Sequence, residues 1–172
     1  CGVPAPFVGR ERRRQEILKF WHASLGAWPP LIDKPAIETV ETSPREDFTQ
    51  KKVRIEAAEK LKVDGYLLMP KSDGARPAVL VVYYEPETGI GLGKSKLRDF
   101  AYQLARRGFV ALSIGWPTEY TKQQSPARQP LSSLAYVAAN CYNALATLPE
   151  VDPARVGVVG HSFGGKWALF AS

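Results

Sequence analysis

The run VDPARVGVVGHSFGG, residues 151–165, contains the features that decide the fold of this chain. Its apolar part, Val156–Gly160, is typical of a buried β-strand, and it passes directly into the pattern G-x-S-x-G at Gly160, Ser162 and Gly164. A sharp turn between a strand and a helix holds such a serine in a strained backbone conformation, so the residues two positions before and after it must be small. The pattern therefore predicts that the Ser162 hydroxyl projects above a sheet, close to the free N–H groups of a helix N-terminus.

Apolar strands and amphipathic helices alternate along the chain before this turn. Strands are expected at residues 77–84 and 109–114, because each is an almost continuous apolar run of the kind found in strands covered on both faces. Between them a helix is predicted, with Gly108 beyond its end, from apolar residues at helical spacing: Leu97, Phe100, Ala101, Leu104 and Ala105. A longer amphipathic helix is marked by Leu131, Leu134, Ala138, Cys141, Leu145 and Leu148. This alternation predicts an α/β fold with a mostly parallel sheet and flanking helices.

Residues 1–48 differ in character and are expected to form an arm packed on the main body. Residues 1–9 look irregular, and a helix is predicted from Arg10 to Leu25, where Gly26 ends it. The stretch 31–47 is polar and interrupted by prolines, which indicates a connector.

Residues 49–172 are expected to form the N-terminal part of the α/β domain. Its first two strands are predicted at 49–56 and 61–70, joined by a turn near Ala58. A length of 172 residues fits one domain and not two.

Composition excludes several classes of protein. Apolar residues make up 45% of the chain and charged residues 23%, close to the averages for globular proteins, which argues against disorder and coiled coils. No apolar stretch is long enough for a membrane-spanning helix. The net charge of +6 is densest at Arg10–Arg14, but no nucleic-acid-binding motif accompanies this run, so we interpret it as a solvated helix start.

The cysteines carry little information. Cys1 and Cys141 have no metal-ligand spacing and allow at most one disulfide. A first residue of Cys instead of Met fits both a processed, lipidated N-terminus and a trimmed boundary, and it slightly favours an exported protein, whether periplasmic, extracellular or lipid-anchored.

Residues 151–165 resemble the nucleophile elbow of α/β-hydrolases, and within that superfamily they are most similar to dienelactone-hydrolase-like and acetyl-xylan-esterase-like serine hydrolases. The resemblance extends upstream through Gly65–Pro70 and Arg76–Leu80, so it covers about residues 50–172. It implies an esterase that attacks a carboxylic ester with Ser162, forms an acyl-enzyme and needs neither a metal nor another cofactor. The implied partner is a small-molecule or carbohydrate ester, with no nucleic acid involved.

The same resemblance assigns roles to further residues. The backbone N–H of Phe163 would be one oxyanion donor, and the N–H of Tyr84 or Glu85 would be the second. The sequence differs from the family pattern in this loop, where Tyr83-Tyr84-Glu85-Pro86 replaces the His-Gly-Gly-Gly type of sequence. Loops at the carboxyl ends of the strands would shape the substrate pocket, with Tyr83, Trp116 and Tyr120 as candidate lining residues, and the elbow itself would be built from Gly160, His161, Gly164 and Gly165.

The acid and the base of a catalytic triad are missing from this sequence. In α/β-hydrolases they follow the serine, yet residues 163–172 contain no Asp, Glu or His. His161 is expected to point away from the Ser162 hydroxyl and to be buried for structural reasons, and His22 is expected to serve surface or packing roles. We therefore expect the chain to be truncated just after the elbow, with the acid and the His in the remainder of the same hydrolase domain, and to be inactive alone.

Two other functions stay open at this point. A non-catalytic binding module could be built on a hydrolase scaffold, because a fold does not guarantee a reaction. A nucleotide-binding protein could use Gly93-Lys94-Ser95 as the end of a phosphate-binding loop, although Thr88 replaces the first glycine of that motif. The neighbouring strands end at Ile114 and Val159 without the Asp that would hold magnesium, which weakens this alternative.

Overall fold

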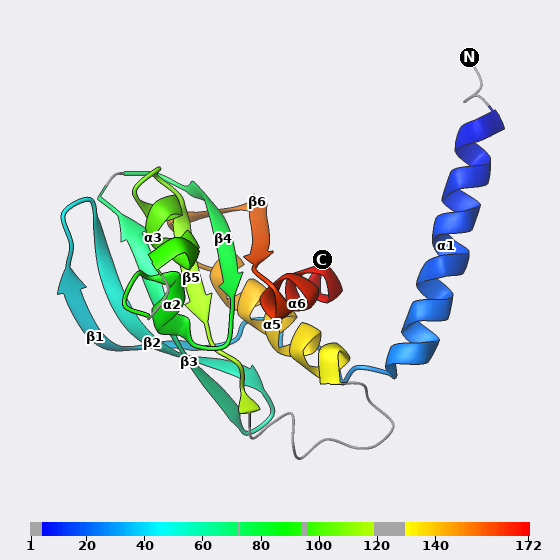
Figure 1. The fold of residues 1–172 in the computed structure, drawn as a ribbon, viewed down its shortest axis with the longest axis horizontal. Helices are drawn as coiled ribbons and strands as arrows, with labels where there is room; N and C mark the ends of the chain where they lie inside the picture. The colour runs from blue at the N-terminus through cyan, green and yellow to red at the C-terminus, as the bar shows by residue number, and fades with distance from the viewer. Residues whose placement is uncertain (1–4, 72, 94–95, 119–129) are drawn as a thin grey trace.

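The computed structural model of the chain describes residues 5–71, 73–93, 96–118 and 130–172. Within these ranges the strands form one sheet of six, in the spatial order β1-β2-β3-β5-β4-β6 (Figure 1). The strands are β1 (Ile37–Pro44), β2 (Phe48–Ala58), β3 (Leu61–Pro70), β4 (Arg76–Val82), β5 (Val110–Ile114) and β6 (Val151–Gly160). The helices are α1 (Ala5–Leu25), α2 (Pro86–Gly89), the 3₁₀ turn η1 (Lys96–Arg98), α3 (Phe100–Ala105), α5 (Pro130–Ala146) and α6 (Phe163–Ala171).

Strands β5, β4 and β6 pair in parallel, as the alternation of strands and helices predicted. Their carboxyl ends lie in register, with Val82 opposite both Ile114 and Gly160. Strands β1, β2 and β3 are instead antiparallel to their neighbours, so the sheet is mixed rather than mostly parallel. The β2–β3 hairpin, predicted near Ala58, turns at Lys60, whose φ is 59°.

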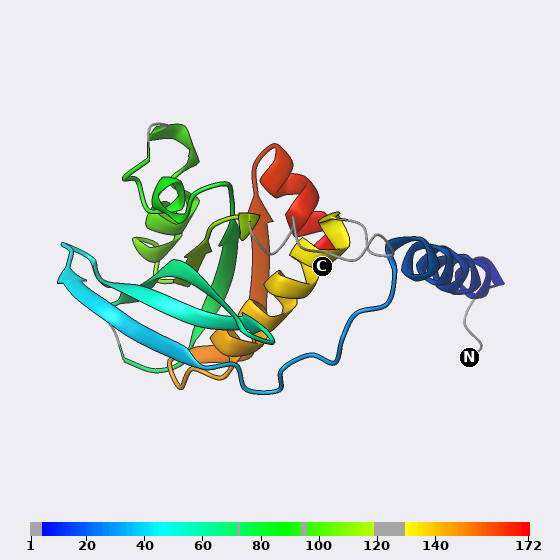
Figure 2. The ribbon, with the colours of Figure 1, turned by 90° about the horizontal axis from the view of Figure 1, so that it is seen from below.

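Helices cover both faces of the sheet, with α5 and α6 on one face and α2 and α3 on the other (Figure 2). Because side chains alternate between the faces along a strand, β4 contributes to both cores. Leu80 and Val82 pack in the cluster on the α5 side, and Val81 packs in the cluster on the α3 side. All three are buried, as predicted for a strand covered on both faces.

The prediction of a connector over residues 31–47 is wrong, because strand β1 lies within it. β1 pairs with β2 at the edge of the sheet, and most of its side chains are exposed. Its sequence, IETVETSP, has no alternation of apolar and polar residues, so the periodicity that marks a half-buried strand is absent. The sheet consequently begins at Ile37, inside the segment expected to be the arm.

Three smaller differences concern element ends. α1 begins at Ala5 and not at Arg10, so it includes residues expected to be irregular. Leu97 was expected on the buried face of a helix but is 89% exposed, because it lies in the 3₁₀ turn η1, where side chains point in other directions than in an α-helix. β4 ends at Val82, before the two tyrosines.

The extended segment after α1, residues 26–36, is attached to α5. The Trp28 indole N–H donates to Ser132 Oγ at 2.9 Å, and the Tyr136 hydroxyl donates to the Pro30 carbonyl at 3.0 Å. The backbone N–H of Ile32 donates to Asn140 Oδ1 at 2.8 Å. These bonds fix the segment on the main body.

Helix α1 itself stands away from the sheet (Figures 1 and 2). Its Trp21 ring packs edge-on against Phe170 of α6, with the centroids 5.7 Å apart. None of the helices within the described ranges combines the length and the apolar character needed to cross a membrane.

Candidate active site

Ser162 lies in the turn between β6 and α6, with φ 56° and ψ −117°. Such a conformation is strained for an L-residue, and among the described non-glycine residues only Ser162 and Lys60 have a positive φ. The strain lies at the residue that the sequence predicted to be a nucleophile. Its side chain is exposed, so the hydroxyl is open to a reactant.

Two glycines beside Ser162 leave no room for a side chain. A Cβ added to Gly160 would collide with the backbone of Gly164, and one added to Gly164 would collide with the carbonyl oxygen of Val82. Gly165 differs, because its added Cβ would lie 3.4 Å from the Gly160 carbonyl oxygen, an ordinary contact. The turn is therefore tight enough to require glycine at Gly160 and Gly164 and tolerant at Gly165.

His161 is exposed, which corrects the expectation of a buried structural side chain. It is the first residue after β6 and precedes α6, so it belongs to neither of these packed elements. His22 is also exposed and lies on α1. It lines a cleft together with Leu169 and Phe170 near the carboxyl end of α6. Ser162 lies at the opposite end of this helix, about 12 Å away along its axis at 1.5 Å per residue.

Backbone N–H groups near Ser162 come from two elements. Phe163 is the first residue of α6, so its N–H has no acceptor within the helix. Tyr84 follows β4, whose last residue, Val82, lies opposite Gly160. Within the described parts of the chain, the Tyr84 N–H donates to no backbone carbonyl. Glu85, the other candidate donor, is the N-cap residue of α2 and is extended, with φ −123°.

Three aromatic rings gather around these amides. The Trp116 and Phe163 rings stack at 4.6 Å with an interplanar angle of 5°, and Tyr84 lies 5.9 Å from each of them. The Trp116 N–H also donates to the Tyr84 carbonyl at 3.1 Å, which ties the ends of β5 and β4 together. Tyr84 is 43% exposed, so its ring is available to a ligand. Trp116, predicted to line the substrate pocket, stacks on Phe163, the residue after Ser162, whereas Tyr120, predicted with it, falls outside the described residues.

Tyr83 is held by a residue that the sequence did not single out. Arg98 Nη1 donates to the Tyr83 hydroxyl at 2.7 Å, and the guanidinium carbon lies 5.7 Å from the ring centroid. The two residues come from separate elements, and no sequence motif joins them. The pair becomes visible only in the folded chain, where Arg98 of η1 lies against Tyr83, the residue that follows β4.

The segment considered as a phosphate-binding loop forms a closed turn. The N–H groups of Leu92 and Gly93 both donate to the Glu87 carbonyl, at 3.0 and 3.2 Å, and the Gly91 N–H donates to Thr88 at 3.2 Å. A phosphate loop needs such amides directed at its ligand, and these three already have acceptors. Lys94 and Ser95 lie outside the described residues.

Other reactive groups lie away from the turn. Cys141 of α5 is a free, fully buried thiol, and burial raises its pKa to about 12. No cluster of three or more His, Cys, Asp or Glu side chains that could hold a metal ion occurs in the described part of the chain. Cys1 is not among the described residues.

Comparison with known proteins identifies relatives that hydrolyse esters. Esterase FrsA of Vibrio cholerae is 33% identical over 106 residues, which cover 61% of this chain and 24% of that protein. The bis(hydroxyethyl) terephthalate hydrolase of Streptomyces coelicolor is 31% identical over 101 residues, which cover 59% of this chain and 30% of that protein. The chain spans less than half of the length of the curated relatives it matches, between 24% and 48%.

Solved structures share the fold at low sequence identity. The glucuronoyl esterase of Solibacter usitatus superposes with a TM-score of 0.71 at 20% identity, covering 93% of this chain and 54% of that one. Acetyl xylan esterases and dienelactone hydrolase-like proteins are also among the structural neighbours, which confirms the resemblance seen in the sequence. The profile of the family described as PET hydrolase-like matches residues 38–172. The chain therefore belongs to the PET hydrolase-like family of α/β-hydrolases.

Proposed function

We propose that the protein is a serine esterase that cleaves carboxylic ester bonds through an acyl-enzyme on Ser162. The observation that carries the proposal is the strained backbone of Ser162, with φ 56°, in a turn that has room only for glycine at Gly160 and Gly164. A nucleophile elbow has this geometry because it presents the hydroxyl at the carboxyl edge of the sheet. The family's ester-hydrolysing relatives support the same reaction.

In the proposed mechanism, Ser162 Oγ attacks the ester carbonyl carbon, and a base removes the hydroxyl proton. The carbonyl oxygen becomes an oxyanion, which the N–H groups of Phe163 and of Tyr84 or Glu85 would stabilise. The C–O bond to the alcohol then breaks, and the alcohol leaves with the proton. Water attacks the acyl-enzyme, releases the carboxylic acid and restores Ser162.

The base and the carboxylate that orients it are proposed to come from residues of the complete protein that follow Ser172. No Asp, Glu or His occurs between Phe163 and Ser172. His22 lies near the carboxyl end of α6, whereas Ser162 precedes its amino end. His161 is the immediate neighbour of the proposed nucleophile in a tight turn. A general base must lie within hydrogen-bond reach of the proton that it abstracts.

The proposed substrate is a small-molecule or carbohydrate ester. The stacked rings of Trp116, Phe163 and Tyr84 beside the proposed oxyanion donors support a substrate with an apolar or flat group next to its carbonyl. A bis(hydroxyethyl) terephthalate hydrolase among the relatives is compatible with this surface.

The test is covalent labelling of the complete protein with a fluorophosphonate, followed by peptide mapping. We expect the label on Ser162, and we expect Ser162→Ala to abolish it. Ser172→Ala is the matched control, because Ser172 is an exposed serine at the other end of α6 and its loss should leave labelling unchanged. An unlabelled wild-type protein would instead favour a non-catalytic binding module, and labelling that survives Ser162→Ala would place the nucleophile elsewhere.

A further inference from the structure

Tyr83 belongs to the loop that follows β4 and lies beside Gly164, in the turn that contains Ser162. Arg98 donates a hydrogen bond to its hydroxyl. We propose that Arg98, acting through Tyr83, is a positioning residue for the oxyanion hole of the esterase proposed above. The inference rests on that function, because it concerns the geometry of the same two amide donors. Three sets of contacts carry it.

The first set fixes the backbone at the end of β4. The Tyr83 N–H donates to the Ile114 carbonyl at 3.3 Å, and the Tyr84 carbonyl accepts from Trp116 N–H at 3.1 Å. Both bonds lead to the end of β5, on one side of β4. The Tyr84 N–H between them has no carbonyl acceptor among the described residues. The chain is therefore anchored on both sides of the amide that would stabilise an oxyanion.

The second set joins Tyr83 to the elbow. A Cβ added to Gly164 would lie 3.4 Å from Tyr83 Cδ2 and would collide with the Val82 carbonyl oxygen, so the first turn of α6 rests directly on Val82 and Tyr83. Phe163 precedes Gly164, and Tyr84 follows Tyr83. The Phe163 and Tyr84 amides are consequently each one residue away from this contact, and Glu85, the alternative second donor, is two residues away. We infer that the position of the Tyr83 ring sets the separation of the donors from the two segments.

The third set fixes the far end of the Tyr83 side chain. Arg98 Nη1 donates to its hydroxyl at 2.7 Å, and the Arg98 guanidinium also lies against the ring, 5.7 Å from the centroid. Hydrogen bonds from a charged donor are shorter and stronger than those between neutral groups. A planar guanidinium can make the hydrogen bond and the ring contact in a fixed orientation, which the ammonium of lysine cannot reproduce. Arg98 therefore limits the movement of the ring that supports both amides.

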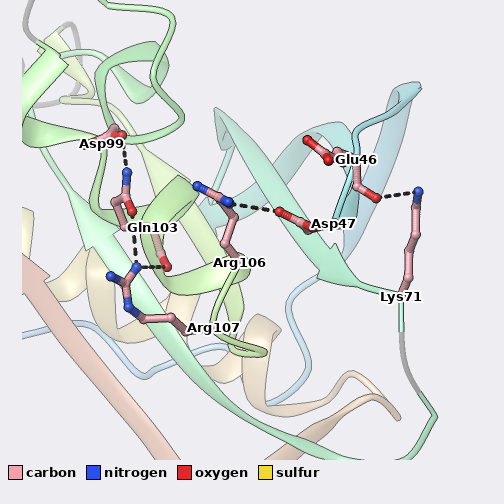
Figure 3. Close-up of polar contacts among 7 residues, drawn as sticks. All are labelled: Glu46, Asp47, Lys71, Asp99, Gln103, Arg106 and Arg107. Carbon is pink, nitrogen blue, oxygen red and sulfur yellow. Dashed lines mark hydrogen bonds and ion pairs between the residues drawn. The ribbon is translucent and has the colours of Figure 1, made fainter.

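A purely structural role is the competing explanation, and the chain contains a matched control for it. The guanidinium carbon of Arg106, the residue after α3, lies 5.7 Å from the Tyr102 ring centroid. Arg106 Nε also donates to Asp47 at 2.8 Å (Figure 3). It precedes β5, at the amino ends of the parallel strands, whereas Ser162 follows their carboxyl ends. Arg106→Met should thus remove a comparable Arg–Tyr contact without changing the oxyanion hole.

The experiment measures p-nitrophenyl acetate hydrolysis by the complete protein, with the active sites counted by fluorophosphonate labelling. Tyr83→Phe removes only the hydroxyl, and Arg98→Met removes the donor. We expect kcat per labelled site to fall about tenfold in each variant, as for loss of a hydrogen bond to a charged group, with KM changed less than about twofold. Arg98→Lys should restore only part of kcat and also serves if Arg98→Met does not fold. Arg106→Met should keep kcat within about twofold of wild type.

The double variant Tyr83→Phe with Arg98→Met distinguishes a shared role from two separate ones. Because both changes break the same bond, its kcat should lie within about twofold of the single variants. Additive losses, or single variants that lower the melting temperature but keep kcat, would overturn the proposed role of Arg98. If the wild-type protein is not labelled at Ser162, the proposed esterase function is refuted. If it is labelled but kcat does not change when Arg98 is substituted, only the proposed role of Arg98 is refuted.

Discussion

At the scale of single residues, the backbone around Ser162 has the least freedom to change. An added Cβ at Gly160 would meet the Gly164 carbonyl group, and neither backbone can move without shifting the start of α6. We therefore expect Gly160→Ala to lower the free energy of unfolding by about 2–3 kcal/mol, as overpacking does, and to reduce fluorophosphonate labelling at least tenfold. Gly165→Ala, whose Cβ would make only an ordinary contact, is the control. Equal behaviour of the two variants in thermal unfolding and labelling would contradict this account of the turn.

Cys141 gives a residue-scale prediction about pH. Burial raises the pKa of its thiol from the ordinary value of 9.0 to about 12, so the folded protein holds the thiol proton more tightly than the unfolded chain does. The free energy of unfolding should accordingly fall as pH rises from about 9 towards 12, by up to about 1.4 kcal/mol per pH unit. Urea titrations of the wild type and Cys141→Ala at several pH values measure this slope, which the variant should lack.

The same burial should make Cys141 unreactive. In a Cys1→Ser background at pH 8, a thiol reagent should modify the chain only after denaturation, because the reactive thiolate is scarce and covered. Rapid modification of the folded protein would mean that α5 is not packed on the sheet as described.

At the scale of elements, Asn140 joins three parts of the chain. Its side chain is fully buried, accepts from the Ile32 N–H at 2.8 Å and donates to the Ala57 carbonyl at 2.9 Å. Asn140→Ala leaves both backbone groups without a partner, and we expect it to cost about 3 kcal/mol of stability. Asn143→Ala removes one bond, to the Ile32 carbonyl, from a half-buried site and should cost about 1 kcal/mol.

Limited proteolysis reports which element is released. In Asn140→Ala, cleavage should become faster within residues 26–36, because this segment lies on α5 through such bonds. If the two asparagine variants lose equal stability and are cleaved alike, the extended segment is not held mainly by Asn140.

At the scale of the whole molecule, β6 is the last strand of the sheet that the described residues form. Its apolar residues Val156, Val158 and Val159 remain half-exposed at this edge. We predict that residues 1–172 alone hydrolyse p-nitrophenyl acetate far more slowly than the complete protein, because a serine without a base is a poor nucleophile. Oxyanion stabilisation without the triad leaves at most about 10³–10⁴-fold acceleration over water. Robust turnover by the isolated chain that His22→Ala abolishes would instead identify His22 as the base.

The sequence by itself determined the elements whose signal is local. The apolar runs of β4 and β5 and the spacing of apolar residues in α5 depend only on neighbours along the chain, and they predicted these elements closely. The elbow is local in the same way, because a glycine two residues on either side of Ser162 is a steric requirement of the turn itself.

Tertiary structure decided the features that depend on partners distant in sequence. The edge strand β1 is held by its antiparallel pairing with β2. Most of its side chains are exposed, so its sequence lacks the apolar periodicity that predicts a strand. His161 is exposed, and Arg98 of η1 bonds to Tyr83, which lies 15 residues away along the chain. These features depend on segments that are far apart in the sequence. The packing that causes them exists only once the chain has folded, so no local pattern could predict them.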